Sequence, residues 1–331
     1  MSTTPDTPFK HAKLTQQVLN TIETPDPYTD PVARQYIFTP EEHRIKQYEL
    51  ADPIGDDAHS PVKGIVHRYP DRVLLKITDT CAVYCRFCFR KETVGGGVGT
   101  LRDEEVQAAL DYVRSHTEIR EIILTGGDPL TLSNRRLGDL LTKIESIGHV
   151  ELIRIHTRAP LVNPARVDDG LLTLFKDMEK ALYVVLHVNH ANEINEAIRK
   201  AVRQLSQTGA VLLSQSVLLK GVNDNPETLE TLFRTLLANR IKPYYLHHPD
   251  LAPGTSHFYV DINRGQDIIK SLRGRVTGLA YPHYVLDLPG GFGKMPLTPC
   301  AVTGSEGTLY EIEDYKGKKH RYPPSPAKEV K

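Results

Sequence analysis

Three of the four cysteines in this chain of 331 residues lie in one short stretch, at Cys81, Cys85 and Cys88. Cysteine thiolates are the usual ligands of iron–sulfur clusters. A cluster of four irons that is held by three thiolates keeps one iron free to bind another molecule. An open metal position is typical of a catalytic site, whereas a structural site is closed. The Cys-x3-Cys-x2-Cys spacing therefore predicts an iron–sulfur cluster that takes part in catalysis.

Three other interpretations of these cysteines are open. A structural zinc site could combine them with Cys300, although zinc ligands usually come as close pairs and Cys300 stands alone. A disulfide would leave the third thiol unpaired. The three thiols could also be unrelated buried side chains. Metal analysis separates the zinc site from the cluster, because only the cluster contains iron and sulfide.

The elements that must position these residues alternate between strands and helices. Short apolar runs rich in β-branched residues predict strands, and a period of 3.6 residues predicts helices. Strands that alternate with helices form parallel βαβ units, and six units are fewer than the eight of a closed TIM barrel. We therefore predict an α/β fold, a partial (βα)6 TIM-type barrel. The predicted strands are 73–77, 121–124, 151–155, 182–187, 210–216 and 242–246, and the predicted helices are 104–115, 136–147, 169–179, 193–207, 226–239 and 262–273.

Three parts of the chain are predicted from its composition. Residues 1–60 are polar and contain many prolines, and we expect them to form an N-terminal helical cap with helices near 13–22 and 40–48. Residues 61–299 contain the core barrel. Residues 300–331 are a C-terminal extension, and its basic, proline-rich end from 316 to 331 is expected to be loose.

Composition also limits the partners and the compartment. Lysine plus arginine and aspartate plus glutamate both total 41, a balance that gives no sign of a nucleic-acid or membrane surface. No apolar run approaches the length of a membrane span, and residues 1–13 lack the apolar core of a signal peptide. Four cysteines suit a reducing compartment better than a disulfide framework. We therefore predict a cytoplasmic protein with no nucleic-acid or membrane partner.

A polar motif ends or follows each predicted strand. In parallel barrels the active site lies at the carboxyl ends of the strands. Any one motif could be a turn or a satisfied polar group in the core, but six motifs at equivalent places indicate a site. In chain order they are Cys81, Gly126-Gly127-Asp128, His156-Thr157-Arg158, His187-Val188-Asn189-His190, Gln215-Ser216 and His247-His248-Pro249-Asp250.

A glycine-rich stretch from Asp287 to Lys294 ends in a lysine. It is not a P-loop, because Leu288 stands where the first glycine is needed and Met295 follows the lysine. A lysine in a mobile glycine-rich loop can instead form a Schiff base with an aldehyde cofactor. The alternative is a plain surface turn that ends in lysine.

The stretch from His67-Arg68-Tyr69-Pro70-Asp71-Arg72 through Cys88-Phe89-Arg90, with an aromatic residue before the last cysteine, resembles the radical S-adenosylmethionine (SAM) superfamily. In particular it is similar to the lysine 2,3-aminomutase family, and the resemblance extends from about Pro61 to Pro299. It implies an isomerase that uses a [4Fe–4S] cluster, SAM and pyridoxal phosphate (PLP) to interconvert L-lysine and L-β-lysine. It also implies the same partial barrel, a PLP-binding loop within it, and a reducing electron donor of the flavodoxin or ferredoxin type.

The resemblance implies that a lysine, two arginines and a tyrosine bind PLP. Lys294 matches the lysine that carries PLP. Arg68, Tyr69 and Arg72 match the phosphate-binding positions, and the planar fork of arginine suits phosphate. Without the resemblance, two arginines in a loop would more often be solvated.

SAM contacts are implied at other strand ends. Gly126, Gly127 and Asp128 match the motif that lies against the methionyl amino end of SAM, although Gly-Gly-Asp-Pro is also a good turn. Gln215 matches a position near the same cofactor. At His247 the family pattern has a tyrosine near the adenine, so the histidine departs from that pattern.

The substrate is implied by three charged residues. Arg90 matches the arginine that holds the substrate carboxylate, and Asp250 and Asp287 match the two acids that hold the distal ammonium of lysine. A buried ammonium needs such neutralising partners. Clostridial members of the family also carry cysteines for a zinc site between subunits. Here position 225 is Asn and the C-terminal end has no cysteine cluster, so any zinc and the homo-oligomer that it would support are left open.

Alternative functions remain. One is the sister activity that isomerises lysine for attachment to elongation factor P, although that branch differs at Asp287. Another is a 2,3-aminomutase for a different amino acid, such as arginine. A third, of a different class, is a non-catalytic zinc-binding scaffold.

Overall fold

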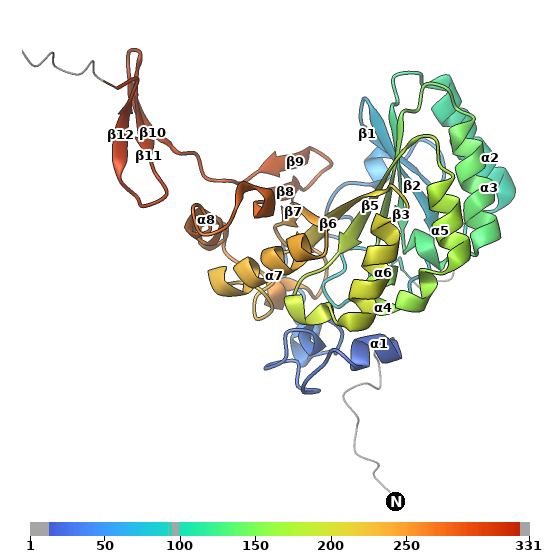
Figure 1. Ribbon diagram of the computed structural model, residues 1–331, viewed down its shortest axis with the longest axis horizontal. Coiled ribbons are helices and arrows are strands. Elements are labelled where there is room, and N and C mark those ends of the chain that lie inside the picture. Colours follow the sequence, from blue (N-terminus) through green and yellow to red (C-terminus); the bar gives the residue numbers. More distant parts are fainter. Residues whose placement is uncertain (1–12, 92, 95–98, 325–331) are drawn as a thin grey trace, which may run out of the picture.

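The computed structural model describes residues 13–91, 93–94 and 99–324, which form a partial barrel with a small separate sheet (Figure 1). One nine-stranded sheet has its strands in chain order. Its parallel strands are β2 (Arg72–Thr78), β3 (Glu121–Gly126), β4 (Leu152–Thr157), β5 (Ala181–His187), β6 (Val211–Val217), β7 (Lys242–His247) and β8 (His283–Leu288). At the edges β1 (Ile65–Tyr69) pairs antiparallel with β2, and β9 (Gly293–Pro296) pairs antiparallel with β8. The partial TIM-type barrel is thereby confirmed, with one more parallel strand than predicted.

Helices cover the outer side of this sheet, as Figure 1 shows for α2, α3, α5 and α6. All six predicted helices are present, with ends shifted by a few residues. Their starts follow the sequence signals: Asn225 accepts a hydrogen bond from the Thr228 amide, and Pro226 occupies the first turn of α7. The helices are α2 (Asp103–Ser115), α3 (Asn134–Glu145), α5 (Asp169–Lys176), α6 (Glu196–Ser206), α7 (Pro226–Ala238) and α8 (Ile262–Ser271), and a short α4 (Ala159–Val162) follows β4.

Side chains along each strand alternate between the apolar core under the helices and the interior of the barrel. On β2 the buried residues Leu75 and Ile77 belong to the same apolar core as Leu110 of α2, whereas Arg72 and Leu74 line an internal cavity. Successive side chains of a strand point to opposite faces of the sheet. The sheet therefore presents an apolar face to the helices and a partly polar face to the interior.

The N-terminal segment is less helical than predicted. The helix expected near 13–22 is reduced to α1 (Gln16–Leu19), and the one near 40–48 is only a 3-10 turn, Pro40–His43. Residues 43–48 are exposed. Because helices in proteins gain most of their stability from burying an apolar face, this stretch has little to hold it helical.

The C-terminal extension contains a three-stranded sheet that projects from the barrel (Figure 1). Its strands are β10 (Val302–Glu306), β11 (Leu309–Glu313) and β12 (Lys319–Tyr322). The expectation of a loose end from residue 316 is therefore wrong for β12, and the part after 324 lies outside the described residues. Across β11 and β12, Glu311 lies opposite Arg321 and Glu313 lies opposite Lys319. Glu311 also forms a diagonal ion pair with Lys319 at 2.7 Å, and such cross-strand pairs stabilise a sheet.

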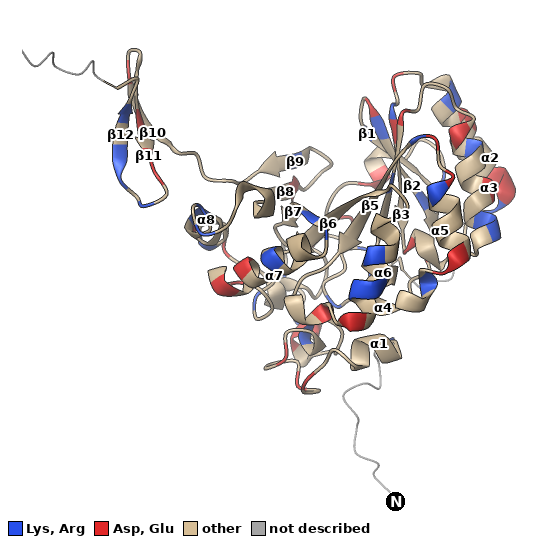
Figure 2. Cartoon of the chain, in the orientation of Figure 1, with Lys and Arg blue, Asp and Glu red and all other residues tan. Residues whose placement is uncertain are grey.

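Charge is mixed over the outer surface of the molecule. Figure 2 shows acidic and basic residues interspersed along the outer helices, with basic residues prominent on α6. In the described part of the chain, no helix has both the length and the apolar character that crossing a membrane requires.

Candidate active site

A cavity of about 460 Å³ lies on the interior face of the sheet. This size is in the usual range for small-molecule sites. Every residue that the sequence singled out for a cofactor or substrate lines it, although these residues are spread over more than 220 positions of the chain. They are Arg68, Tyr69, Arg72, Cys81, Cys85, Cys88, Arg90, Gly126, Gly127, Asp128, Gln215, His247, Asp250, Asp287 and Lys294.

The three clustered cysteines lie in the loop after β2 and are free thiols, and the fourth, Cys300, is exposed and outside the cavity. Across residues 13–91, 93–94 and 99–324, no three side chains of His, Cys, Asp or Glu converge closely enough to hold one metal ion. A zinc ion needs its ligands around one point, whereas a cluster takes each thiolate at a different iron. Three free thiols that line one cavity suit the ligand set of a cluster.

Burial favours the protonated, neutral form of two of these thiols, Cys81 and Cys88. It raises the pKa of Cys88 to about 11, and together with the charge of Asp128 it raises the pKa of Cys81 further. Metal ligands must be thiolates, so metal binding here releases protons and supplies the positive charge that the buried thiolates lack.

Lys294 lies on strand β9, and the expectation of a mobile loop is wrong. Asp287 on β8 is its partner across the strand pair, and Nζ of Lys294 lies 2.6 and 2.7 Å from the two carboxylate oxygens. The backbone amide of Lys294 donates to the hydroxyl of Tyr69 at 2.7 Å. Gly290 and Gly291 have φ of +89° and +82°, so the glycines supply the left-handed turn between two paired strands.

The two arginines beside this lysine are also on strands, Arg68 on β1 and Arg72 on β2. Arg68 donates to the carbonyl of Ile54 at 2.6 Å, and its Nη1 lies 3.9 Å from Asp287. The Arg72 guanidinium lies 3.9 Å from the centre of the Tyr69 ring. Both cations therefore face the cavity near Lys294, a suitable place for an anionic group.

The glycine motif after β3 packs tightly on the cysteine loop. A Cβ on Gly126 would lie 2.3 Å from the carbonyl oxygen of Thr78, and a Cβ on Gly127 would lie 2.3 Å from that of Thr80. Asp128 is buried and accepts hydrogen bonds from the Thr157 hydroxyl and from the amides of residues 130, 158 and 159. The motif therefore fixes the cysteine loop, in addition to lining the cavity.

The two acids Asp250 and Asp287 differ in charge state. Burial and the nearby charge of Asp287 raise the pKa of Asp250 to about 7, and its Oδ1 is buried with no hydrogen-bond partner among the described residues. Burial also opposes ionisation of Asp287, but the hydrogen bond from His247 and the charge of Lys294 hold its pKa well below the usual range. Of these two acids, Asp287 therefore has a cation as its partner, whereas Asp250 forms no ion pair with a described residue.

His247 ends β7, with its Nδ1 3.5 Å from the carboxylate of Asp287. Burial lowers the pKa of His247 below its ordinary value, so the ring is neutral at neutral pH and can donate one hydrogen bond. Burial likewise lowers the pKa values of His156 and His187, which line the same cavity.

Asp56 is a site residue that the sequence analysis missed. It is buried, and its carboxylate lies 2.8 Å from Arg90 and 3.2 Å from Arg68. Although burial opposes the charged form, Arg90, Lys76 and Arg68 hold the pKa of Asp56 below its usual value. It comes from the irregular N-terminal segment, where no motif or periodicity marks it. Asp56 thus balances the cations to which anionic ligands would bind.

Comparison with known proteins places this site in a family. The family model described as Radical SAM superfamily matches residues 75–232. L-lysine 2,3-aminomutase of Methanococcus maripaludis is 43% identical over 87% of this chain, which spans 66% of that protein. Putative L-lysine 2,3-aminomutase of Aquifex aeolicus is 40% identical over 93% of this chain and 83% of that protein. L-lysine 2,3-aminomutase of Clostridium subterminale is 38% identical over 92% and 73%, respectively.

The similarity to these relatives covers the part of the chain that forms the cavity. The identity extends over most of the barrel that carries the free thiols, the strand-bound lysine and the paired acids. The chain therefore belongs to the lysine 2,3-aminomutase family of the radical SAM superfamily.

Proposed function

We propose that this protein is an isomerase that converts L-lysine to L-β-lysine by moving the α-amino group to C3. The observation that carries this proposal is the pair of acids, Asp250 and Asp287, in one cavity with Arg90 and Lys294. When bound, the cluster with SAM supplies the radical, and PLP supplies the conjugated group that the amino migration needs.

The residues around the cavity suit these three groups. Cys81, Cys85 and Cys88 would hold the cluster, and Lys294 would bind PLP covalently. Arg68, Tyr69 and Arg72 would contact the PLP phosphate, and Gly126, Gly127, Asp128, Gln215 and His247 would line the SAM site.

Substrate selection would follow from two charged residues that line the cavity, Arg90 and Asp250. Arg90 has a buried Nε without a hydrogen-bond partner in the described part of the chain, so it can still donate to a substrate carboxylate. Asp250 has an unpaired carboxylate oxygen there as well, and a distal ammonium would both bind it and favour its ionised form. An amino acid with a cationic side chain would therefore pair with both Arg90 and Asp250. A shorter or acidic amino acid would leave Asp250 without a partner.

A relative named glutamate 2,3-aminomutase, from Clostridioides difficile, is 34% identical over 93% of this chain. Glutamate would place its side-chain carboxylate where this protein has Asp250 and Asp287. Two negative charges facing a third are strongly unfavourable in a buried site. The acids therefore favour lysine over glutamate.

The surroundings proposed for this enzyme follow from the cluster. A reduced cluster requires a reducing setting, for which we propose the cytoplasm and an electron donor of the flavodoxin or ferredoxin type. We also propose that residues 1–60 act as an N-terminal cap, residues 61–299 as the catalytic barrel and residues 300–331 as an extension outside the active site.

The substrate assignment is tested by Asp250→Asn, which removes a charge and keeps the shape. Losing one partner of a buried charge pair costs about 2–5 kcal/mol, so kcat/KM for lysine should fall by roughly 30-fold to several-thousand-fold. Iron content, PLP loading and SAM binding should survive. Asp287→Asn should damage turnover as much, but because Asp287 also contacts Lys294 the Asp250 variant is the sharper test.

Asp267→Asn provides the matched control, because this acid is exposed on α8 and lies outside the cavity. It should retain the parent kinetics. If Asp250→Asn and Asp287→Asn both turn over lysine at the parent rate, the acids do not bind the substrate. Selection for or against a distal positive charge would then have to come from other residues.

A further inference from the structure

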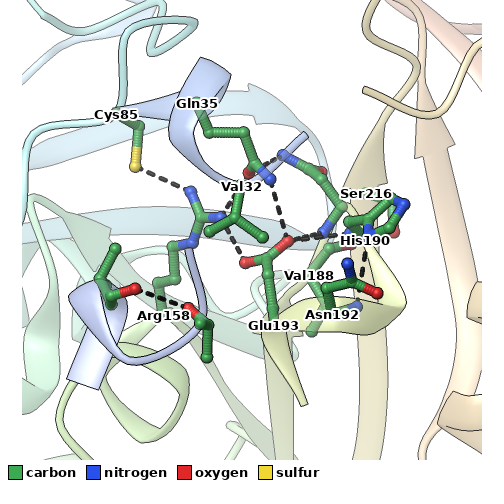
Figure 3. A network of polar contacts seen from close by, with 12 residues as sticks. Val32, Gln35, Cys85, Arg158, Val188, His190, Asn192, Glu193 and Ser216 are labelled. Carbon is green, nitrogen blue, oxygen red and sulfur yellow. Dashed lines mark hydrogen bonds and ion pairs between the residues drawn. The ribbon is translucent and has the colours of Figure 1, made fainter. Parts of the chain in front are cut away.

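Arg158 is a buried cation in contact with one of the clustered cysteines. Its Nη1 donates to the sulfur of Cys85 at 2.9 Å (Figure 3). Its Nη2 donates to Oε1 of Gln35 at 2.6 Å and to Oε2 of Glu193 at 2.5 Å. Only 7% of the arginine is exposed. A full positive charge is therefore fixed beside a sulfur that the cluster would use.

The partners of Arg158 are themselves held by hydrogen bonds. Glu193 accepts from the amides of Asn189 and His190, both at 2.8 Å, and Oε1 of Gln35 accepts from the side chain of Asn189 at 3.0 Å. Gln35 and Asn189 are fully buried. The Nε of Arg158 has no hydrogen-bond partner among the described residues, but both of its terminal nitrogens and the side chains of Gln35, Asn189 and Glu193 are paired, and this pairing fixes how the guanidinium lies. The guanidinium cannot turn away from Cys85 without breaking two charged or polar contacts.

Gln35 brings the N-terminal segment into this network. Its backbone carbonyl accepts from the amide of Arg86, which lies between Cys85 and Cys88, at 2.8 Å. The side chain of Arg86 binds the carboxylate of Glu42 at 2.5 and 2.8 Å. The N-terminal segment therefore holds the cysteine loop from outside the barrel, through both backbone and side chains.

The physical effect of this arrangement concerns the charge of the cluster. Reduction adds one electron, and hydrogen bonds and positive charge at the ligand sulfurs stabilise the more negative state. If Arg158 served only to pair with Glu193, its Nη1 would not need to donate to the sulfur of Cys85.

We infer that Arg158 is a positioning residue that orients the Cys85 ligand and raises the reduction potential of the cluster, and that Gln35 of the N-terminal segment holds it in place. This inference rests on the proposed function only in requiring the cluster at Cys81, Cys85 and Cys88. It gives residues outside the barrel a role in the electron-transfer step.

The test is a redox titration followed by EPR on the anaerobically reconstituted protein without SAM, with iron content measured in parallel. Arg158→Gln removes the charge and should lower the ratio of reduced to oxidised cluster at a fixed poise by about tenfold, a shift of about 59 mV to more negative potential for one electron. Arg158→Lys keeps the charge and should retain part of the parent potential. Gln35→Met removes only the support and should give a smaller shift in the same direction.

Arg166→Gln is the matched control, because the Arg166 side chain is also largely buried but donates to the carbonyls of Leu130 and Leu132 and not to a cysteine sulfur. It should leave the potential unchanged. If Arg158→Gln does not load iron, the Arg158→Lys and Gln35→Met variants decide the question.

The outcomes separate the two proposals. Variants that bind a full cluster at the parent potential overturn the inference and leave the proposed function intact. A parent protein that binds no cluster contradicts the proposed function itself, and the inference with it.

Discussion

The carboxylate of Asp287 contacts the ammonium of Lys294. It also lies near the ring of His247 and the guanidinium of Arg68. If Lys294 forms a Schiff base with a cofactor aldehyde, as proposed, its nitrogen would be held in the imine, and Asp287 would then be placed to neutralise a cation of the substrate as well. The same acid would thus serve the lysine in the free protein and the substrate in the loaded one.

Reductive trapping tests the assignment of Lys294. Borohydride treatment of the PLP-loaded protein should fix the label on the peptide that contains Lys294, as seen by mass spectrometry. Lys294→Ala should lose the label and the isomerisation but still bind SAM. Lys176→Ala changes an exposed lysine at the end of α5 and should behave like the parent. A label on any other lysine would refute the assignment.

The pKa of Asp250 predicts how lysine binding depends on pH. Burial and the charge of Asp287 raise this pKa to about 7, so the acid is largely protonated below that pH and ionised above it. The ε-ammonium of lysine, with a pKa of about 10.4, stays charged throughout. Only the ionised acid attracts it, so KM should rise as pH falls through 7, by about tenfold at one unit below the pKa.

Steady-state kinetics at about pH 6 and pH 8 would check this profile in parent and Asp250→Asn proteins. The variant has no carboxyl to titrate, so its KM should be high and should change little with pH. A parent profile that is equally flat would show that Asp250 is not the group that the ammonium meets.

Strand β9 determines where Lys294 lies. Gly293 has φ of +90°, and a Cβ there would lie 2.8 Å from the hydroxyl of Tyr69. Gly293→Ala therefore combines a left-handed backbone strain of about 1–2 kcal/mol with a clash against the residue that binds the Lys294 amide. PLP loading, followed by absorbance, should fall severalfold.

Gly307→Ala controls for backbone strain alone. Gly307 also has a left-handed φ of +61°, but no atom lies within 4 Å of the Cβ position, and it belongs to the projecting sheet. It should leave PLP loading unchanged. Equal losses in the two variants would mean that strain, and not the position of Lys294, is responsible.

The strands and helices that were predicted from the sequence are those with a clear period. The six apolar runs are all strands, because a strand that is covered by helices needs continuous apolar residues. Strands β1, β8 and β9 were missed because they lie at or next to an edge and carry polar residues such as Arg68, Asp287 and Lys294. Reading the glycines before Lys294 as a mobile loop ignored that a glycine turn also joins paired strands.

The active-site residues were predictable where a strand end placed them. Cys81, Asp128 and Asp250 follow strands, and the parallel sheet brings such residues to one edge whatever their distance along the chain. Asp56 and Gln35 come instead from the N-terminal segment, where the described elements before β1 are one four-residue α-helix and short 3-10 turns; Gln35 ends one such turn and Asp56 precedes another. Their positions depend on tertiary packing against the barrel, for which a single sequence carries no periodic signal.

At the scale of the whole molecule, the catalytic cavity and the projecting sheet are separate. The residues that line the cavity end at Lys294, whereas the sheet begins at Val302. Its contacts with the barrel side include the ion pair of Lys270 with Glu313 at 2.6 Å. Residues 300–324, the part of the extension that the structure describes, therefore do not line this cavity.

Ending the chain after Cys300 should accordingly leave iron content, PLP loading and SAM affinity at parent values. The thermal midpoint should change by only a few degrees, since an ion pair with an exposed lysine contributes about 1 kcal/mol or less. Iron content and scanning calorimetry would check both points. Loss of the cluster in the shortened protein would show that the extension supports the active site.

The central claim, that lysine is rearranged in this cavity, is tested most directly by product analysis. The anaerobically reconstituted protein, with SAM, PLP and a strong reductant, would be given L-lysine, L-arginine, L-glutamate or L-alanine in separate reactions, each with a control that lacks SAM. We expect SAM-dependent β-lysine from lysine and little or no product from glutamate and alanine, which place no cation between Asp250 and Asp287. Conversion of glutamate or alanine in preference to lysine, or no product from lysine by fully loaded protein, would contradict the claim.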